Sequence, residues 1–386
     1  MSFLKCIFES ITLEDSWEQR KLGDTVNSIV AGGDIDKSKI QENGKYPVYA
    51  NALTNDGVIG YYNDQYRVKA PAVTVTGRGE IGVAKTRNTN FTPVVRLLAI
   101  NSMHNNYFLE NLINTHRAFA ESTGVPQLTA PQLANYKLKF PKSIEEESKI
   151  GNFFNNLDSL ITLHQRKLNK LKKLKSAYLT EMFPDEGEHK PKRRFAGFTD
   201  DWEQRKLGDM GNVITGNTPS TKDKSNWTTD KNKGHIWITP TDINRKVLFD
   251  SERYLSDKGW LKARKIPKNS VLITSIASIG KNAINGIDAA FNQQINALIL
   301  QNNNYYFVLS LMDKEKKRFE ALAGQTATPI INKSTFSSFQ LQIPSENEQN
   351  KIGNFFKKID NLITLHQRKI DKLQKLKNAY LNEMFV

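Results

Sequence analysis

Residues 149–183 read KIGNFFNNLDSLITLHQRKLNKLKKLKSAYLTEMF, and residues 351–385 read KIGNFFKKIDNLITLHQRKIDKLQKLKNAYLNEMF. These two stretches are identical at 26 of 35 positions, so one long segment is present twice in the chain. A shorter block, WEQRKLGD, also occurs twice, at 17–24 and 202–209. The sequence between block and long segment is far less alike in the two halves. The chain is therefore one design duplicated, with its frame retained and its interior changed, which suggests two units that recognise different things.

Both long segments carry the apolar stripe of a helix that packs against another helix. Leu174 widens the stripe, and Lys175 and His164 interrupt it; the second copy repeats both interruptions at Lys377 and His366. Polar residues in such a stripe usually fix the register of paired helices. Because the copies match in length and pattern, we expect them to pair with each other, antiparallel. The predicted contact residues are Phe154, Leu157, Ile161, Leu168 and Leu171 in the first copy and Phe356, Ile359, Ile363, Ile370 and Leu373 in the second.

Length and the duplication both predict two domains in the 386 residues. We expect an α+β fold in which two mixed α/β domains are joined by two long helices that form an antiparallel coiled coil with internal pseudo-two-fold symmetry. The polar stretch DEGEHKPKRR after Pro184 is typical of a linker. The predicted boundaries are 1–148 for the first variable domain, 149–183 for the central helix, 184–199 for the linker, 200–350 for the second variable domain and 351–386 for the C-terminal helix.

The charge of the chain favours a polyanion as partner. The net charge is +15, and each long segment alone carries +5. The alternative is that lysine-rich helices are simply well solvated. Cys6 is the only cysteine, which excludes a disulfide within the chain and makes a reducing cytoplasm the expected compartment. No apolar run approaches the roughly 18–20 residues that span a bilayer, and the acidic N-terminus does not resemble a secretory signal.

The variable segments are predicted to be mixed α and β. Each contains a short apolar strand that runs into an Ile-Gly pair, in TGRGEIGVAK at 76–85 and TSIASIGKNA at 274–283. We call these the two Ile-Gly turns. The other expected elements are strands at 73–76 and 271–275, a hairpin from 46–51 and 57–63, and helices over 111–122 and 305–323.

Basic and amide side chains gather in the variable segments around these turns. Arginine and lysine bind guanine edges or phosphates, and asparagine and glutamine read adenine. Any one of these residues is also compatible with an ordinary polar surface, but their placement in the segments that are not duplicated favours DNA recognition. The leading candidates are Arg78 and Lys281. The full set is Lys69, Arg78, Lys85, Arg87, Lys222, Lys224, Lys281, Asn292, Gln293 and Gln294.

Motifs of catalysis are missing or misplaced. Residues 77–82 match GxGxxG, but the sequence that follows is not helical, as a dinucleotide-binding loop requires. Pro184-Asp185 and Glu188-His189-Lys190 resemble a nuclease motif, but they lie in the linker and too close together. We find no phosphate-binding loop, HExxH, adenine-methyltransferase motif or Ser/His/Asp set. The chain is therefore predicted to bind rather than to catalyse, with no metal and no cofactor of its own.

These residues resemble the DNA-specificity subunits of Type I restriction–modification systems. The shared features are WEQRKLGD opening each half, RFAGF at 194–198, and IGxFFxxxDxLITLHQRKxxKLxxLKxAYLxEMF closing each half. The first half departs from the pattern, since FESITLED at 8–15 stands in place of RFAGF. The resemblance implies two target-recognition domains that each read half of a split, asymmetric site in double-stranded DNA. It also implies modification subunits that hold S-adenosylmethionine, methylate adenine and dock on the long helices, and restriction subunits for cleavage.

Three alternatives stay open on the sequence. One is a stand-alone DNA-modifying or DNA-cutting enzyme, which the missing motifs argue against. Another is a coiled-coil adaptor without a nucleic-acid role. The third is the specificity part of another restriction-type enzyme. Salt-dependent binding to random duplex DNA distinguishes a DNA-binding protein from an adaptor.

Overall fold

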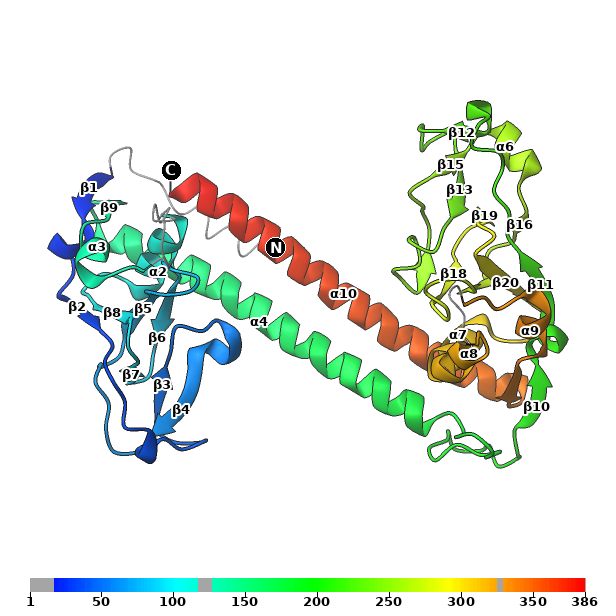
Figure 1. Ribbon diagram of the computed structural model, residues 1–386, viewed down its shortest axis with the longest axis horizontal. Helices are drawn as coiled ribbons and strands as arrows, with labels where there is room; N and C mark the ends of the chain where they lie inside the picture. Colours follow the sequence, from blue (N-terminus) through cyan, green and yellow to red (C-terminus); the bar gives the residue numbers. More distant parts are fainter. Residues whose placement is uncertain (1–16, 117–126, 325–328, 386) are drawn as a thin grey trace. The chain divides into compact units, whose positions relative to one another are not determined.

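The structure is a computed structural model that describes residues 17–116, 127–324 and 329–385. Contacts divide the chain into two units: unit 1 is Met1–Gln165 with Arg368–Val386, and unit 2 is Arg166–Gln367. The chain passes from unit 1 to unit 2 within the long helix α4 (Ile144–Glu181) and returns within α10 (Glu346–Met384) (Figure 1). The FESITLED segment and the last part of the helix predicted at 111–122 lie outside the described residues.

The duplicated block WEQRKLGD forms the same small sheet in each unit. β1 (Glu18–Lys21) pairs antiparallel with β9 (Lys137–Phe140), and β10 (Glu203–Lys206) pairs antiparallel with β21 (Gln340–Ile343). The four block residues in each strand are exposed, whereas the leucine that follows them is fully buried. Each sheet therefore joins the first strand of its unit to the strand that precedes a long helix.

Each unit also contains two larger sheets. In unit 1 their strand orders are β2-β8-β5-β6 and β4-β3-β7, and in unit 2 they are β11-β20-β17-β18-β14 and β12-β15-β13-β19-β16. The strands of unit 1 are β2 (Ser28–Ala31), β3 (Tyr46–Tyr49), β4 (Val58–Tyr62), β5 (Ala72–Thr76), β6 (Ala84–Arg87), β7 (Thr92–Pro93) and β8 (Leu97–Asn101). Those of unit 2 are β11 (Gly211–Thr215), β12 (Trp227–Thr228), β13 (His235–Ile238), β14 (Val247–Leu248), β15 (Tyr254–Leu255), β16 (Lys265–Ile266), β17 (Val271–Thr274), β18 (Asn282–Asn285), β19 (Ala289–Phe291) and β20 (Ile295–Leu300).

The predicted strands before the Ile-Gly turns are confirmed as β5 and β17. Each is an interior strand of its sheet, and every residue of each is buried. The predicted hairpin is confirmed as the antiparallel pair β3–β4. The shorter helices are α2 (Asn106–Thr115), α3 (Ala130–Ala134), α5 (Leu207–Met210), α6 (Asp257–Lys262), α7 (Tyr305–Lys314), α8 (Lys316–Ala321) and α9 (Lys333–Ser338), with 3-10 turns η1 (Leu22–Asp24), η2 (Lys37–Lys39), η3 (Thr54–Gly57) and η4 (Lys224–Asn226).

A capped short helix packs on the start of the long helix in each unit. Asn105 caps α2 and Asn304 caps α7. Each side chain accepts hydrogen bonds from two backbone N–H groups in the first turn of its helix. A Cβ added to Gly151 would lie 2.1 Å from the amide oxygen of Asn105, and one on Gly353 would lie 2.2 Å from that of Asn304. The glycine of each KIG motif is therefore needed for this close approach.

The long helices pair antiparallel inside each unit. In unit 1 the ring of Phe153 lies edge-on to that of Tyr380, with centroids 5.1 Å apart. In unit 2 Tyr178 contacts Phe355 in the same way at 4.9 Å. The start of α4 thus meets the end of α10, and the end of α4 meets the start of α10, as the sequence predicted.

The residues predicted to make the contacts between the long helices are buried or half-buried, except for one leucine that was expected to widen the stripe. Leu174 is 39% exposed and does not widen the stripe, although its counterpart Leu376 packs on the core of unit 1. The other predicted contacts are buried at Phe154, Leu157, Leu168, Phe356, Ile359 and Ile370 and half-buried at Ile161, Leu171, Ile363 and Leu373.

The two lysines that interrupt the stripe form equivalent ion pairs. Lys175 Nζ lies 2.7 Å from an oxygen of Asp360 in unit 2, and Lys377 Nζ lies 2.7 Å from one of Asp158 in unit 1. The unit 2 pair is the more buried, with side chains 12% and 10% exposed against 22% and 40%. Asp360 also accepts from the hydroxyl of Tyr306 at 3.0 Å, and burial together with this carboxylate raises the pKa of Tyr306. The pairs therefore differ in their surroundings although their sequences match.

This difference predicts unequal effects of one substitution. Lys175→Ala is expected to lower the free energy of unfolding by about 2–3 kcal/mol, because it leaves a buried carboxylate without its charged donor. Lys377→Ala, the matched control, is expected to cost at most about 1 kcal/mol, as exposed ion pairs do. Urea denaturation of the two variants checks this prediction, and equal losses would contradict it.

The predicted bounds of four helices differ from those of the structure. α4 and α10 begin five residues before the repeated segments at 149 and 351, because a helix starts where its first turn is stabilised and not where sequence identity begins. Acidic residues in both first turns favour the positive end of the helix dipole. α2 likewise begins at Asn106, next to its cap, rather than at 111. The helix predicted over 305–323 is divided into α7 and α8 at Glu315.

Candidate nucleic-acid interface

The two Ile-Gly turns have the same backbone although only two of their six residues, at 77–82 and 275–280, agree. Each begins at a threonine, Thr76 or Thr274, whose hydroxyl accepts the N–H seven residues further on at 2.9 or 3.0 Å. Each ends at a glycine, Gly82 or Gly280, with φ of +78°, a value that favours glycine. The turns link β5 to β6 and β17 to β18, so no helix follows them. The element after each turn is a strand and not the helix that a dinucleotide-binding loop requires.

In unit 1 the structure separates the four predicted contacts. Arg78 is exposed in the turn itself. Lys69 is exposed too, but it precedes β5 and so lies at the end of that strand far from the turn. Arg87 pairs with Ala72 in the register of β5 and β6, which places it at the far end as well. Lys85 lies in β6, opposite Thr74, so Arg78 is the one of the four that lies between Thr76 and Gly82.

Arg87 is held inside unit 1. Its side chain is 7% exposed, and its guanidinium lies 3.8 Å from the centroid of the Tyr49 ring and 2.8 Å from a carboxylate oxygen of Asp56. Asp56 also pairs with Lys85. The guanidinium of Arg87 is therefore engaged by its own unit, and we do not retain it as a DNA contact.

In unit 2 the structure brings some predicted contacts together. Lys281 is exposed directly after the turn, and the carbonyl of Gln294 accepts the N–H of Ser275 at the start of the turn, at 2.8 Å. Asn292 and Gln293 stand beside Gln294 between β19 and β20, where both bond to the Thr218 hydroxyl. The residues 292–294 thus adjoin the turn.

Two other predicted contacts of unit 2 lie elsewhere. Lys222 is exposed just before η4, and Lys224 is exposed as the first residue of η4. In the chain, both come before the strands of the sheet that contains β13. They line neither of the two cavities beside the turn. The structure therefore provides no link between these lysines and the turn.

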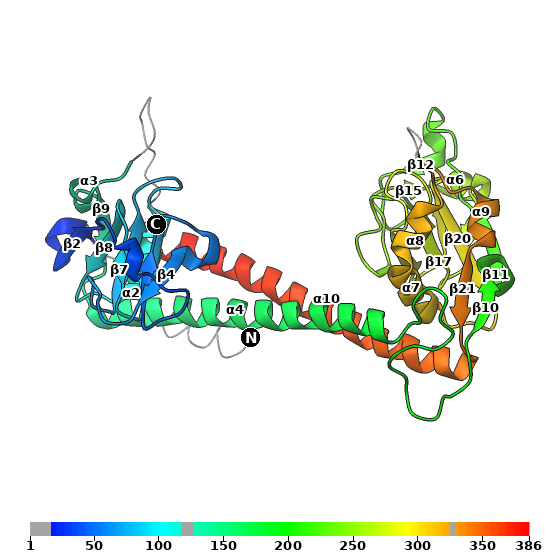
Figure 2. The same ribbon diagram turned by 60° about the horizontal axis from the view of Figure 1, so that its bottom comes forward.

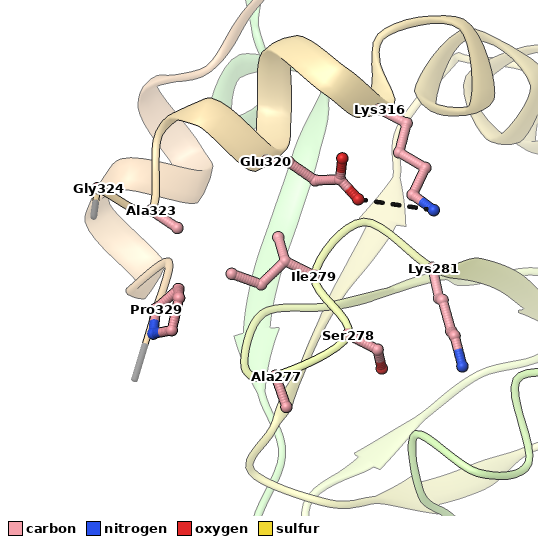
Figure 3. A pocket seen from close by; sticks show the side chains of 9 residues that line it. All are labelled: Ala277, Ser278, Ile279, Lys281, Lys316, Glu320, Ala323, Gly324 and Pro329. Carbon is pink, nitrogen blue, oxygen red and sulfur yellow. Dashed lines mark ion pairs between the residues drawn. The ribbon is translucent and has the colours of Figure 1, made fainter. Parts of the chain in front are cut away.

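Sequence reasoning missed cations that lie close to the turns. Lys316 at the start of α8 lines the same two cavities as Lys281, and Figure 3 shows both lysines to one side of Ile279. Arg245 lines one of these cavities with them. In unit 1 a Cβ on Gly77 would lie 2.2 Å from the carbonyl oxygen of Arg96, so Arg96 also adjoins its turn. No spacing in the sequence links these residues to the turns, because they come from separate segments.

The described residues contain no group of His, Cys, Asp or Glu side chains that could hold a metal ion. Among the same residues, no helix is long and apolar enough to cross a membrane. The features that stand out are therefore the two turns with their cations and amides.

Arg78 tests the turn of unit 1. Arg78→Ala is expected to weaken binding of the target duplex by about 1–3 kcal/mol and to leave random duplex unchanged if the guanidinium reads a base. If it contacts a phosphate, both affinities fall equally and the salt slope drops by about one. Lys69→Ala, from the far end of β5, is the matched control. Titrations at several salt concentrations measure both quantities, and no change in either would remove this turn from the DNA interface.

Comparison with known proteins identifies the family. The profile described as "Type I restriction modification DNA specificity domain" matches residues 14–173 and 199–375. The chain is 30% identical over 195 residues to the Type I restriction enzyme MjaIX specificity subunit of Methanocaldococcus jannaschii, a match that covers 48% of this chain and 44% of that protein. It is 29% identical over 170 residues to the EcoR124I/EcoR124II specificity subunit of Escherichia coli, covering 42% and 41%. Each of these matches thus spans less than half of the relative's length.

Longer matches exist at lower identity. The MjaVIII specificity subunit of Methanocaldococcus jannaschii is 22% identical over 404 residues, covering 96% of this chain and 92% of that protein. The crystal structure of the S subunit of a Type-I restriction-modification system from M. genitalium has a TM-score of 0.74 at 14% identity, covering 97% and 98% of the two chains, which shows a shared fold. With the profile matching both halves, the chain belongs to the family of Type I restriction–modification DNA specificity subunits.

Proposed function

We propose that this chain directs a Type I restriction–modification complex to a bipartite, asymmetric site in double-stranded DNA, for adenine methylation or cleavage by other subunits. One observation carries the proposal: two turns with the same hydrogen bond from a backbone N–H to a threonine hydroxyl and the same terminal glycine stand in matching frames but present different side chains. Unit 1 presents Arg78 and Glu80, whereas unit 2 has Ile276 and Ser278 at the same two positions of its turn. Different donors and acceptors read different bases, so each unit reads its own half of the site.

The frame supports a second part of the proposal, that the long helices dock the modification subunits. The segment LITLHQRK is identical in both copies, at 160–167 and 362–369. Leu163 is 44% exposed in unit 1 and its counterpart Leu365 is 45% exposed in unit 2. Two exposed leucines within identical segments could each contact one of two copies of the same partner. S-adenosylmethionine is then held by the modification subunits, and restriction subunits join for cleavage.

The two leucines predict the stoichiometry. Leu163→Glu and Leu365→Glu are each expected to weaken the binding of one of two modification subunits about tenfold, because a charge would enter an apolar contact. Native mass spectrometry of the complexes at decreasing concentration measures this. Complexes of each variant should lose one modification subunit at a higher concentration than complexes of the unchanged chain. Leu174→Glu, an exposed leucine outside the identical segment, is the control. Loss of both subunits at once, or of neither, would contradict the prediction.

Mapping of methylated adenines in the genome of a host that expresses the chain with its partner subunits tests the proposed function. The expected result is one split, asymmetric motif that disappears when this chain is removed. The competing function, a coiled-coil adaptor without a DNA role, predicts no motif and no salt-dependent binding to random duplex DNA.

A further inference from the structure

A cationic cavity lies against the Ile-Gly turn of unit 2. Its volume is about 280 Å³, and the residues that line it come from the segment before β14, the end of the turn, and the helices α7 and α8. Four of them are cations and one is an acid. The charged lining residues are Arg245, Lys246, Lys281, Lys316 and Asp313.

The one carboxylate is already neutralised. Asp313 accepts from Lys246 at 2.6 Å and from Lys175 at 3.4 Å. Lys246 also donates to the amide oxygen of Asn282 at 2.8 Å, and its burial lowers its pKa. These lining groups are paired with one another, so the acid does not offset the three remaining cations.

Three cations are left to face solvent. Among the described residues, Arg245 and Lys281 take part in none of the ion pairs, and both are exposed. Lys316 pairs with Glu320 at 3.6 Å, in a contact whose side chains are 45% and 42% exposed (Figure 3). Such an exposed pair is weak. The cavity therefore has a local excess of positive charge.

Packing fixes where two of these cations leave the backbone. A Cβ on Gly280 would lie 3.0 Å from Cγ of Lys316, so the start of α8 rests directly on the end of the turn. Lys281 follows that glycine in the chain, and its N–H donates to the Thr274 hydroxyl at 3.0 Å. Cations fixed on separate elements around one cavity suit a compact, multiply charged anion better than a base edge, which needs paired donors and acceptors.

We propose that this cavity binds one phosphate group of the DNA backbone, next to the half-site that unit 2 reads, through Arg245, Lys281 and Lys316. The inference rests on the proposed function and adds a role to it: this contact sets the position of unit 2 on the duplex and reads no base.

Unit 1 lacks the key cation. Val83 stands where unit 2 has Lys281, because Thr76 and Thr274 are equivalent in the two turns. The cavity beside the unit 1 turn, about 200 Å³, is lined by Lys85 and Arg87, but Asp56 pairs with both of them. The phosphate contact is thus a property of unit 2, and the two turns differ in what they do.

Charge-removing variants test the site in the complete complex with its modification subunits. Lys281→Gln, Lys316→Gln and Arg245→Gln are each expected to weaken target and random duplexes equally, about three- to tenfold, and to lower the salt slope by about one. Lys317→Gln, which removes the same charge one position along α8 and lines neither cavity, is the matched control and should change neither quantity. Glu320→Gln should strengthen binding of both duplexes about twofold, because it frees Lys316.

A modified duplex locates the contact. Replacing single phosphates of the target by uncharged methylphosphonates should weaken binding of the unchanged complex at one position beside the unit 2 half-site. The Lys281→Gln/Lys316→Gln variant should show no further loss at that position. Loss of target binding alone would make these residues base readers, and unchanged binding of both duplexes would remove the cavity from the interface; either result overturns the inference. Failure of the proposed function is distinguishable, because the unchanged complex would then not prefer its target.

Discussion

Arg194→Ala is expected to lower the free energy of unfolding by about 3–5 kcal/mol, because it leaves a fully buried carboxylate without its partner. The guanidinium of Arg194 bonds both oxygens of Glu348, each at 2.7 Å, and the Glu348 side chain is 0% exposed. This bond to Glu348 raises the pKa of Arg194. The pair ties Arg194, the first residue of RFAGF within the linker, to the first turn of α10. The loss is to be measured by urea denaturation.

The neighbouring arginine is the matched control. Arg193 pairs with Glu181, but its side chain is 58% exposed, so Arg193→Ala should leave the denaturation midpoint unchanged within error. The double variant Arg194→Met/Glu348→Met should recover most of the loss, since an apolar pair replaces a buried ionic one at little cost. Equal midpoints for Arg193→Ala and Arg194→Ala would show that the buried pair does not stabilise the start of α10.

Glu146 is the residue of unit 1 that corresponds to Glu348, and its hydrogen-bond donor is different. The indole N–H of Trp17 donates to Glu146 at 3.0 Å. In unit 2 the equivalent glutamate is taken by Arg194, and the buried indole N–H of Trp202 has no partner among the described residues. The two units thus satisfy one buried carboxylate with different donors, although their frames share the block WEQRKLGD.

Exchange of residues 25–140 for the same segment of a related chain is expected to replace one half of the methylated site completely and to leave the other half and the spacing unchanged. The reason is that the segment contains the turn and sheets of unit 1 but neither the duplicated block nor the long helix. Mapping of methylated adenines in the host genome measures the outcome.

The reciprocal exchange is the control. Replacing residues 210–343 should change the other half of the site and preserve the first. If either exchange alters both halves, recognition is not modular, and the two turns do not read separate half-sites.

The sequence by itself determined the duplicated architecture. A repeat of 35 residues with helical spacing requires a partner for its apolar stripe, and the nearest match is the other copy. Strands β5 and β17 were also predictable, because both are short runs rich in β-branched residues that lead into an Ile-Gly pair. The family could be named from the duplicated blocks before any geometry was known. These features depend on residues close together in the chain, which is why local patterns revealed them.

Only the tertiary structure decided what the charged residues do. Arg87 was predicted to contact DNA, but Asp56 and Tyr49, from distant segments, hold it inside unit 1. Lys175 was recognised as a break in the stripe, but its partner Asp360 is 185 residues away. Arg245 and Lys316 were missed because their cavity assembles from segments on either side of Lys281. The effect of a charge depends on its neighbours in space and on its distance from water, and the order of residues along a chain specifies neither directly.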